Sequence, residues 1–384
     1  MLKKDMLENQ ALTAHALLFD DVHGNLLSAE DKDGCPASKY ETIPKGCQLH
    51  ENGDVTFSFF APDAKSVQVA GLGSDFSAAK IELDKGAGGW WSATVSGIDS
   101  GIHYHDYFVD GTRTVNPYAP YCFGCGRVMN FFELPDKYSN FYLMQNVPHG
   151  TVRMDYFKSE VVSRTRVCWV YTPPSYETSY DRRYPVLYLQ HGASESETGW
   201  IWQGKINHIA DNLIADGMCE EMIIVMNCGN AYPKDGRVAD HPLMNFTDDL
   251  IARDSVPFID AKYRTITDRR RRAVAGLSMG GGQAQRTAFR YPELFSSCGI
   301  FSAPVDNVRE SMKKPFTDAQ KFNSDYDLFF VSTGENENIF EINRTFIQEL
   351  RGKGFHCMFF STPGYHDWQV WRYSAREFLT HLWR

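Results

Sequence analysis

The turn around Ser278 constrains the fold of this chain more than any other part of its sequence. Ser278 lies in the pattern Gly-x-Ser-x-Gly, between Gly276 and Gly280, after the apolar run 272–275 and before a helix-like stretch, 283–291. Glycine two residues to either side lets a strand and a helix pass close together, and the turn holds the serine in a strained, exposed backbone position. The pattern alone occurs by chance in many chains, but its strand and helix context predicts that Ser278 is a nucleophile.

A serine hydroxyl is a poor nucleophile until a positioned base takes its proton. Three histidines follow Ser278. His356 lies in a strand-like apolar run, and His381 lies near the end of a closing helix. His366 lies in a loop after a strand and before that helix, which is where a base at the rim of a sheet has to be. We therefore predict that His366 is the base.

The acid that orients the histidine is expected in the loop after the preceding strand, 328–333, because the order in α/β-hydrolases is serine, acid, histidine. Two glutamates, Glu335 and Glu337, lie in that loop, and Asp306 is a more distant alternative. We prefer Glu337. The residues themselves do not exclude Glu335 as the acid.

Ester hydrolysis also needs N–H donors aimed at the developing oxyanion. The residue after the nucleophile, Met279, supplies one backbone N–H. The second is expected after the buried strand 184–190, where Gly192 and Ala193 follow a histidine. That histidine, His191, precedes the serine in the chain, so we expect it to brace the loop rather than to act on substrate.

The region from about Val161 to Arg384 resembles the esterase D / feruloyl esterase group of α/β-hydrolases, which includes acetyl xylan esterases and enterochelin esterase. The matching stretches are Tyr184–Gly192, Pro257–Asp260, Tyr263–Thr265, Arg272–Gly281 and His366–Trp368 with Trp371. The resemblance implies a mostly parallel sheet flanked by helices, with Ser278 as nucleophile and His366 as base. It puts the acid at Glu337, three residues after Gly334, where the family more often has aspartate.

Four aromatic residues are expected near the substrate. Trp200 and Trp202 follow the oxyanion loop, and Tyr365 and Trp368 flank the predicted base. They favour a hydroxycinnamoyl group, so feruloyl or related esters of plant sugars are the first expected substrates and acetylated sugars the second. Aromatic core packing would explain the same residues. An enterochelin-type siderophore ester is a third alternative, which the acidic charge disfavours, and acyl transfer to another acceptor is a fourth.

The N-terminal part has short alternating runs between Gly53 and Val115, separated by Gly, Asp and Pro clusters, which indicates an antiparallel β-sandwich. It resembles the early-set immunoglobulin-like, carbohydrate-binding-module-like domain that precedes related esterases. Trp90 and Trp91 could stack on sugar, but adjacent strand residues face opposite ways. Shaping of the esterase entrance and glycan binding both remain open. We expect four segments: an extension at 1–40, the sandwich at 41–135, a linker at 136–150 and the esterase at 151–384.

Composition narrows the remaining possibilities. A length of 384 residues favours two domains, and a net charge of −9 argues against nucleic acid as a partner. The basic run 269–272 is expected to be a solvated or ion-paired turn. No apolar run reaches the ~18 residues that a membrane helix needs. The N-terminus lacks the apolar core of a secretory signal, so we expect a cytoplasmic protein.

Other sequence features point to no cofactor and no metal. Nine scattered cysteines suit reduced thiols, and Cys122 and Cys125 form a CxxC pair without a second pair at zinc-site spacing. His103 and His105 alternate on one strand face, where an interdomain or entrance role is favoured over a metal site. The expected partner is a small-molecule or oligosaccharide ester. A homodimer is compatible with the sequence, which does not fix the oligomeric state.

Overall fold

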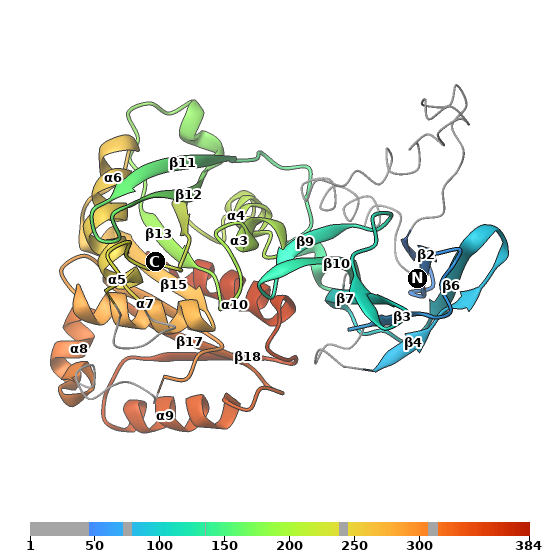
Figure 1. Cartoon of the computed structure of the whole chain (residues 1–384). Helices are drawn as coiled ribbons and strands as arrows, with labels where there is room; N and C mark the ends of the chain where they lie inside the picture. Colours follow the sequence, from blue (N-terminus) through green and yellow to red (C-terminus); the bar gives the residue numbers. More distant parts are fainter. Residues whose placement is uncertain (1–45, 72–78, 135, 238–244, 306–313) are drawn as a thin grey trace. The chain divides into compact units, whose positions relative to one another are not determined.

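The computed structural model describes residues 46–71, 79–134, 136–237, 245–305 and 314–384. The chain divides into two compact units, Met1–Ser139 and Asn140–Arg384 (Figure 1). Their boundary falls inside the expected linker, 136–150. The expected extension, 1–40, lies outside the described residues.

The described part of the first unit consists of antiparallel strands in two sheets. One sheet has the order β1-β2-β6-β5, and the other has the order β4-β3-β7-β10-β9, with β8 paired to β7. The strands are β1 (Cys47–Leu49), β2 (Val55–Phe60), β3 (Val67–Ala70), β4 (Lys80–Glu82), β5 (Asp84–Lys85), β6 (Trp90–Val95), β7 (Gly101–Val109), β8 (Thr112–Thr114), β9 (Tyr121–Gly124) and β10 (Arg127–Leu134).

Alternation along these strands places one face of each sheet in the core of the sandwich. In β6, Trp91 is buried and its indole N–H donates to the Ala61 carbonyl, whereas Trp90 is half-buried beside Phe60. The two tryptophans therefore face opposite ways, as the strand period predicts.

The two histidines of β7 belong to the same core. His103 and His105 are both buried, and both rings contact Phe132. Burial lowers the pKa of His105 to about 3, so its ring stays neutral at pH 7. Both side chains are packing residues of the sandwich, so the expected entrance role is wrong, and the interdomain alternative stays a prediction.

The second unit is built on a mixed sheet with the strand order β11-β12-β14-β13-β15-β16-β17-β18. The β11–β12 and β12–β14 pairs are antiparallel, and the other pairs are parallel. The strands are β11 (Thr151–Ser159), β12 (Arg164–Thr172), β13 (Val186–Gln190), β14 (Ile223–Asn227), β15 (Arg272–Leu277), β16 (Ser297–Phe301), β17 (Leu328–Gly334) and β18 (Met358–Thr362).

Helices cover both faces of this sheet, so its central strands are apolar on both sides (Figure 1). One core contains side chains of α6, α7, α8 and α9, and α10 packs on the opposite face against β16 and β17. The helices are α3 (Gly199–Trp202), α4 (Ile206–Ala215), α5 (Thr247–Leu250), α6 (Val256–Lys262), α7 (Met279–Arg290), α8 (Ala319–Asp325), α9 (Phe340–Gly352) and α10 (Trp368–His381), with a π-helical turn at Ile251–Ser255. The predicted α/β-hydrolase fold after a β-sandwich is confirmed.

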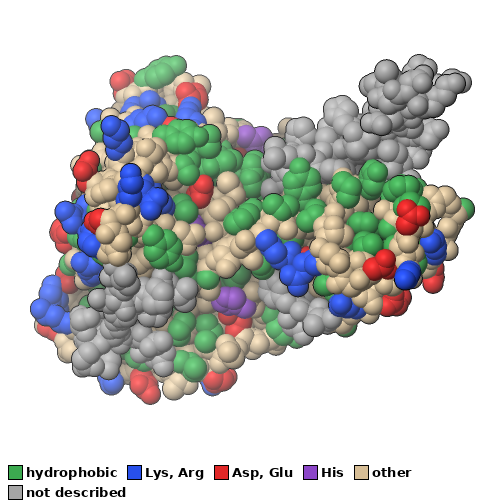
Figure 2. Space-filling view, in the orientation of Figure 1, with side chains coloured by type: hydrophobic (Ala, Val, Ile, Leu, Met, Phe, Trp, Pro, Cys, Tyr) green, Lys and Arg blue, Asp and Glu red, His purple; other side chains and the backbone are tan. Residues whose placement is uncertain are grey.

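Charged side chains cover much of the helical surface. Figure 2 shows Lys and Arg side chains gathered around α6. Ion pairs within the fold include Arg286, which donates to Asp248 at 2.8 Å, and Lys262, which contacts Asp155 at 2.6 Å. None of the helices in the described ranges is long and apolar enough to cross a membrane.

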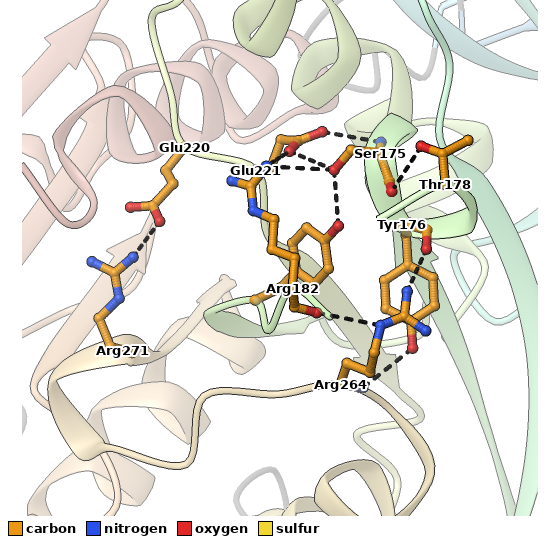
Figure 3. Close-up of polar contacts among 9 residues, drawn as sticks. Ser175, Tyr176, Thr178, Arg182, Glu220, Glu221, Arg264 and Arg271 are labelled. Carbon is orange, nitrogen blue, oxygen red and sulfur yellow. Dashed lines mark hydrogen bonds and ion pairs between the residues drawn. The ribbon is translucent and has the colours of Figure 1, made fainter. Parts of the chain in front are cut away.

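The amino ends of β13, β14 and β15 meet in a polar network, which we call the amino rim: Ser175, Arg182, Glu220, Glu221, Arg264 and Arg271 (Figure 3). Glu221 accepts hydrogen bonds from the backbone N–H of Ser175 at 3.1 Å and from its hydroxyl at 2.6 Å, and it also pairs with Arg182. The Arg264 guanidinium stacks 3.8 Å from the centre of the Tyr176 ring.

The basic run 269–272 is anchored at this same end of the sheet. Arg269 donates to the Pro292 carbonyl at 2.7 Å, and Arg272 pairs with Asp260 at 2.8 Å. Arg270 and Arg271, which lie between these two arginines in the chain, pair with Asp327 and with Glu220 respectively. The prediction of an ion-paired turn is confirmed.

Candidate active site

Ser278 stands between the end of β15 and the start of α7. Its backbone has φ 50° and ψ −119°, a conformation that non-glycine residues rarely adopt. The flanking glycines are required by space: a Cβ atom on Gly276 would lie 2.4 Å from the Gly280 carbonyl oxygen, and one on Gly280 would lie 2.5 Å from the His191 oxygen. The sequence therefore forms the strained turn that its pattern predicts, and the turn carries the serine.

The structure brings Ser278, His366 and Glu337 together. The Nε2 atom of His366 lies 2.9 Å from the Ser278 hydroxyl oxygen, and its Nδ1 atom lies 2.7 Å from Glu337 Oε2. A carboxylate accepts hydrogen bonds, so Nδ1 carries the proton and Nε2 presents its lone pair to the hydroxyl. The His366 side chain is 47% exposed and that of Glu337 is 2% exposed, so the relay runs from the interior to solvent.

Two further groups hold Glu337 in place. Its Oε1 atom accepts hydrogen bonds from the Ser302 hydroxyl at 2.6 Å and from the Gly334 backbone N–H at 2.8 Å. The neighbouring Glu335 instead accepts from Ser361 at 3.0 Å on the exposed surface. Of the two glutamates, only Glu337 contacts His366, and the third alternative, Asp306, lies outside the described residues.

The expected oxyanion loop packs against the nucleophile strand. A Cβ atom on Gly192 would lie 2.5 Å from Leu277 Cδ1, which shows how closely the loop approaches β15. Met279 is the first residue of α7, and its N–H belongs to the first turn, where donors have no acceptor within the helix. Both residues stay predicted donors to the oxyanion.

His191 braces this loop from beneath. Its Nε2 atom accepts the Gly229 N–H at 2.8 Å, so Nδ1 carries the proton and donates to the Gly192 carbonyl at 2.8 Å. Burial lowers the pKa of His191 to about 4, which keeps the ring neutral at pH 7. The bracing role that the sequence predicts for His191 agrees with these bonds.

The loop after β14 contributes a junction that sequence reasoning missed. The Gly229 carbonyl accepts hydrogen bonds from Asn245, Thr247 and Gln283, at 2.8, 2.7 and 3.0 Å. Gln283 belongs to α7, so this junction ties the nucleophile helix to the loop that holds His191. No motif marks these residues in the sequence.

The four aromatic residues expected to contact substrate divide into two pairs. Trp200 and Trp368 are only 1% and 2% exposed, so neither offers a surface to a ligand, and that expectation is corrected for both. Tyr365 is 38% exposed beside His366, and Trp202 is half-buried against Trp169. These two remain candidates for substrate contact.

Asp367 places a second carboxyl group beside the base. It begins α10, where its side chain accepts the Val370 N–H at 3.1 Å. Burial raises the pKa of Asp367 to about 6, and the charge of Glu337 adds to the shift.

The described residues contain no cluster of three His, Cys, Asp or Glu side chains that could hold a metal ion.

Comparison with known proteins agrees with both units. Residues 159–380 match the family model of putative esterases, and residues 44–119 match carbohydrate-binding module 48, described as an isoamylase N-terminal domain. An endo-1,4-beta-xylanase/feruloyl esterase of Xylanibacter ruminicola is 34% identical over 88% of this chain. The chain spans only 46% of that relative's length.

Two solved structures have a similar fold. A ferulic acid esterase is 28% identical, with a TM-score of 0.53 over 62% of this chain and 98% of its own. The enterobactin esterase of Shigella flexneri, 16% identical, covers 88% of this chain and 95% of its own with a TM-score of 0.63, a likeness of fold. On the family match, which spans more than half of its length, this chain belongs to the esterase family and is a carboxylic ester hydrolase.

Proposed function

We propose that the protein hydrolyses feruloyl or related hydroxycinnamoyl esters of plant sugars through an acyl-enzyme. The observation that carries the proposal is the continuous relay from Glu337 through His366 to the Ser278 hydroxyl. A base within hydrogen-bond reach of a nucleophile, itself oriented by a third group, is the arrangement that activates serine.

The chemistry follows from this geometry. His366 Nε2 takes the proton as Ser278 Oγ attacks the ester carbonyl, and Glu337 stabilises the imidazolium that forms. The oxyanion is held by the N–H of Met279 and by a second N–H from Gly192 or Ala193. Nε2 then gives its proton to the departing alcohol, and the same nitrogen activates the water that releases the acid.

The acyl group is proposed from two supports. The Xylanibacter ruminicola relative and one of the solved neighbours are named as feruloyl or ferulic acid esterases. Tyr365 stands exposed beside the base, and Trp202 is accessible in part, so an aromatic acyl group has rings to contact. An aromatic contact contributes about 0.5–1.5 kcal/mol beyond area burial, which corresponds to roughly a twofold to tenfold preference.

The test is one panel of esters with the same preparation: methyl ferulate, methyl p-coumarate, p-nitrophenyl acetate and a catecholate siderophore ester. We expect the highest kcat/KM for the two hydroxycinnamates and no hydrolysis by Ser278→Ala. A higher kcat/KM for the acetyl ester would favour the acetylated-sugar alternative. Preference for the siderophore ester would favour the second candidate, whose support is the fold shared with the enterobactin esterase.

Several narrower expectations stay predictions. They are the cytoplasmic location, the absence of a nucleic-acid partner, the homodimer, the choice of hydrolysis over acyl transfer, and the alternative roles of the sandwich in shaping the entrance or in binding glycan. Recovery of ferulic acid and free methanol in equal amounts from methyl ferulate would separate hydrolysis from transfer to an added sugar.

A further inference from the structure

A row of aromatic rings begins at the base of the relay and runs through the core behind it. The rings of His366 and Trp371 have centroids 5.1 Å apart at 90°, and Trp371 meets Trp368 at 5.1 Å and 83°. Trp368 then meets Trp200 at 5.4 Å and 90°, and Trp200 meets Phe301 at 6.1 Å and 76°. We call Trp371, Trp368, Trp200 and Phe301 the aromatic array.

The array connects the three parts of the candidate site. Besides contacting His366 at one end, it reaches the oxyanion loop through Trp200, whose indole N–H donates to the Gln190 carbonyl at 2.9 Å, one residue before His191. At the other end, the Phe301 carbonyl accepts the Ser278 N–H at 2.7 Å. Base, oxyanion loop and nucleophile backbone therefore rest on one set of packed rings.

The array is rigid because it is buried and interlocked. Trp200 and Phe301 are fully enclosed, and α3 approaches so closely that a Cβ atom on Gly199 would lie 3.2 Å from Trp368. Close-packed interiors do not deform continuously, so a shift at one ring moves its neighbours. Edge-to-face contacts also have a preferred orientation, which apolar packing by Leu or Val would not supply.

Trp371 gives a second indication of a role beyond packing. Its indole nitrogen is buried and has no hydrogen-bond partner among the described residues. A buried donor without an acceptor costs stability. Leucine would fill space at that position without this cost but would offer no ring to His366.

We propose that the aromatic array is a positioning element of the proposed reaction: Trp371 fixes the plane of the His366 imidazole, and Trp200 fixes the backbone that carries the oxyanion donors. The inference rests on the proposed function of the Ser278 relay. Rates of such reactions depend steeply on geometry, because a misplacement of about 1 Å can cost about a hundredfold.

The first test compares Trp371→Leu with Trp371→Phe. We expect the leucine variant to lose roughly tenfold to a hundredfold in kcat on methyl ferulate with little change in KM, and the phenylalanine variant to recover most of the loss. The control is Phe355→Leu, a buried aromatic residue that packs against Phe316 and Phe322 in the other core. It should lower the melting temperature and leave kcat per folded molecule unchanged.

The second test needs no substrate. The proton on His366 Nδ1 should give a downfield NMR resonance, assigned by its loss in His366→Ala. We expect that resonance to broaden in Trp371→Leu, because its proton would exchange faster with water. Trp200→Phe keeps a ring but removes the bond to Gln190, so it should lower kcat and broaden the resonance less than Trp371→Leu does.

Two outcomes would overturn the inference: a kcat for Trp371→Leu within about twofold of the natural enzyme, or an unchanged Nδ1 resonance in that variant. Failure of the proposed function would look different. Ester hydrolysis would then persist in Ser278→Ala, whereas the NMR comparison would still report on how Trp371 holds the ring.

Discussion

At the amino ends of the esterase strands, charged groups are matched to one another, whereas at the carboxyl ends polar groups are held in strained or exposed positions. At the amino rim, Glu221 accepts two hydrogen bonds from Ser175 and pairs with Arg182 (Figure 3). At the carboxyl ends, Ser278 has a left-handed φ of 50°, and the half-exposed His366 ring faces its hydroxyl.

The difference separates two uses of polar residues in one sheet. A satisfied network stabilises the fold and has nothing left to offer a ligand. A functional site keeps strained or incompletely satisfied groups, and the surrounding structure has to compensate for them. Changes at the carboxyl ends should therefore alter activity far more than stability, and changes at the amino rim should do the reverse.

The largest expected effect is that of Ser278→Ala. Loss of the nucleophile should lower kcat on methyl ferulate by about 10⁴ to 10⁶-fold, because only transition-state binding would remain. Stability should not fall, because the alanine side chain is smaller than that of serine and adds no clash in the turn. Activity assays and thermal melts check both parts, and a variant with a tenth of the natural activity would break the contrast between the two ends.

Glu337→Gln comes next. Without a carboxylate, Nδ1 of His366 loses the acceptor that fixes its tautomer, so we expect kcat to fall by about 10² to 10⁴-fold with little change in KM. The matched control is Glu335→Gln, two residues away, whose partner is the surface hydroxyl of Ser361. Equal losses in the two variants would take the role away from Glu337.

Glu221→Gln should have the opposite signature. The change removes the charge that pairs with Arg182 and weakens the bonds from Ser175, so we expect a loss of about 1 to 3 kcal/mol in the free energy of unfolding. The rate of ester hydrolysis per folded molecule should stay as it is. Denaturant unfolding measures the first quantity, and a fall in kcat at full folding would show that the amino rim acts on the site.

Asp367→Asn tests a limit of this comparison, because Asp367 lies at the carboxyl ends but its effect should be on stability and should change with pH. The folded pKa of Asp367, about 6, is above its ordinary value of 3.8, so its ionisation destabilises the folded state as pH rises from about 4 to 6. Asparagine caps a helix about as well as aspartate. The variant should therefore gain about 1 to 3 kcal/mol at pH 7 and nothing near pH 3, as measured by unfolding at both values.

Sequence reasoning found the residues whose role depends on chain order and strand ends. Ser278, His366 and Glu337 each follow a strand in the parallel part of the sheet, so the order of the strands alone predicts that they share one rim. The glycines at 276 and 280 marked the turn, because the spacing that it requires can be recognised in the local sequence. The alternation of Trp90 and Trp91 was also predictable, because it depends only on the period of a strand.

Tertiary packing decided what the sequence could not. Trp200 and Trp368 lie next to the predicted loops, but contacts with Phe301 and with Trp371 bury them. Nothing in the local sequence distinguishes a buried aromatic residue from one that contacts substrate. Ser302, which follows β16, donates to Glu337 in the loop after β17. Such pairings depend on strand neighbours and side-chain directions that one sequence does not display.

The most direct test of the account is covalent labelling with a fluorophosphonate, which reacts with activated serines, followed by peptide mapping. The account predicts a single adduct on Ser278, slowed strongly by His366→Ala and by competing methyl ferulate. An adduct on another residue, or labelling of Ser278 at an unchanged rate in His366→Ala, would contradict it.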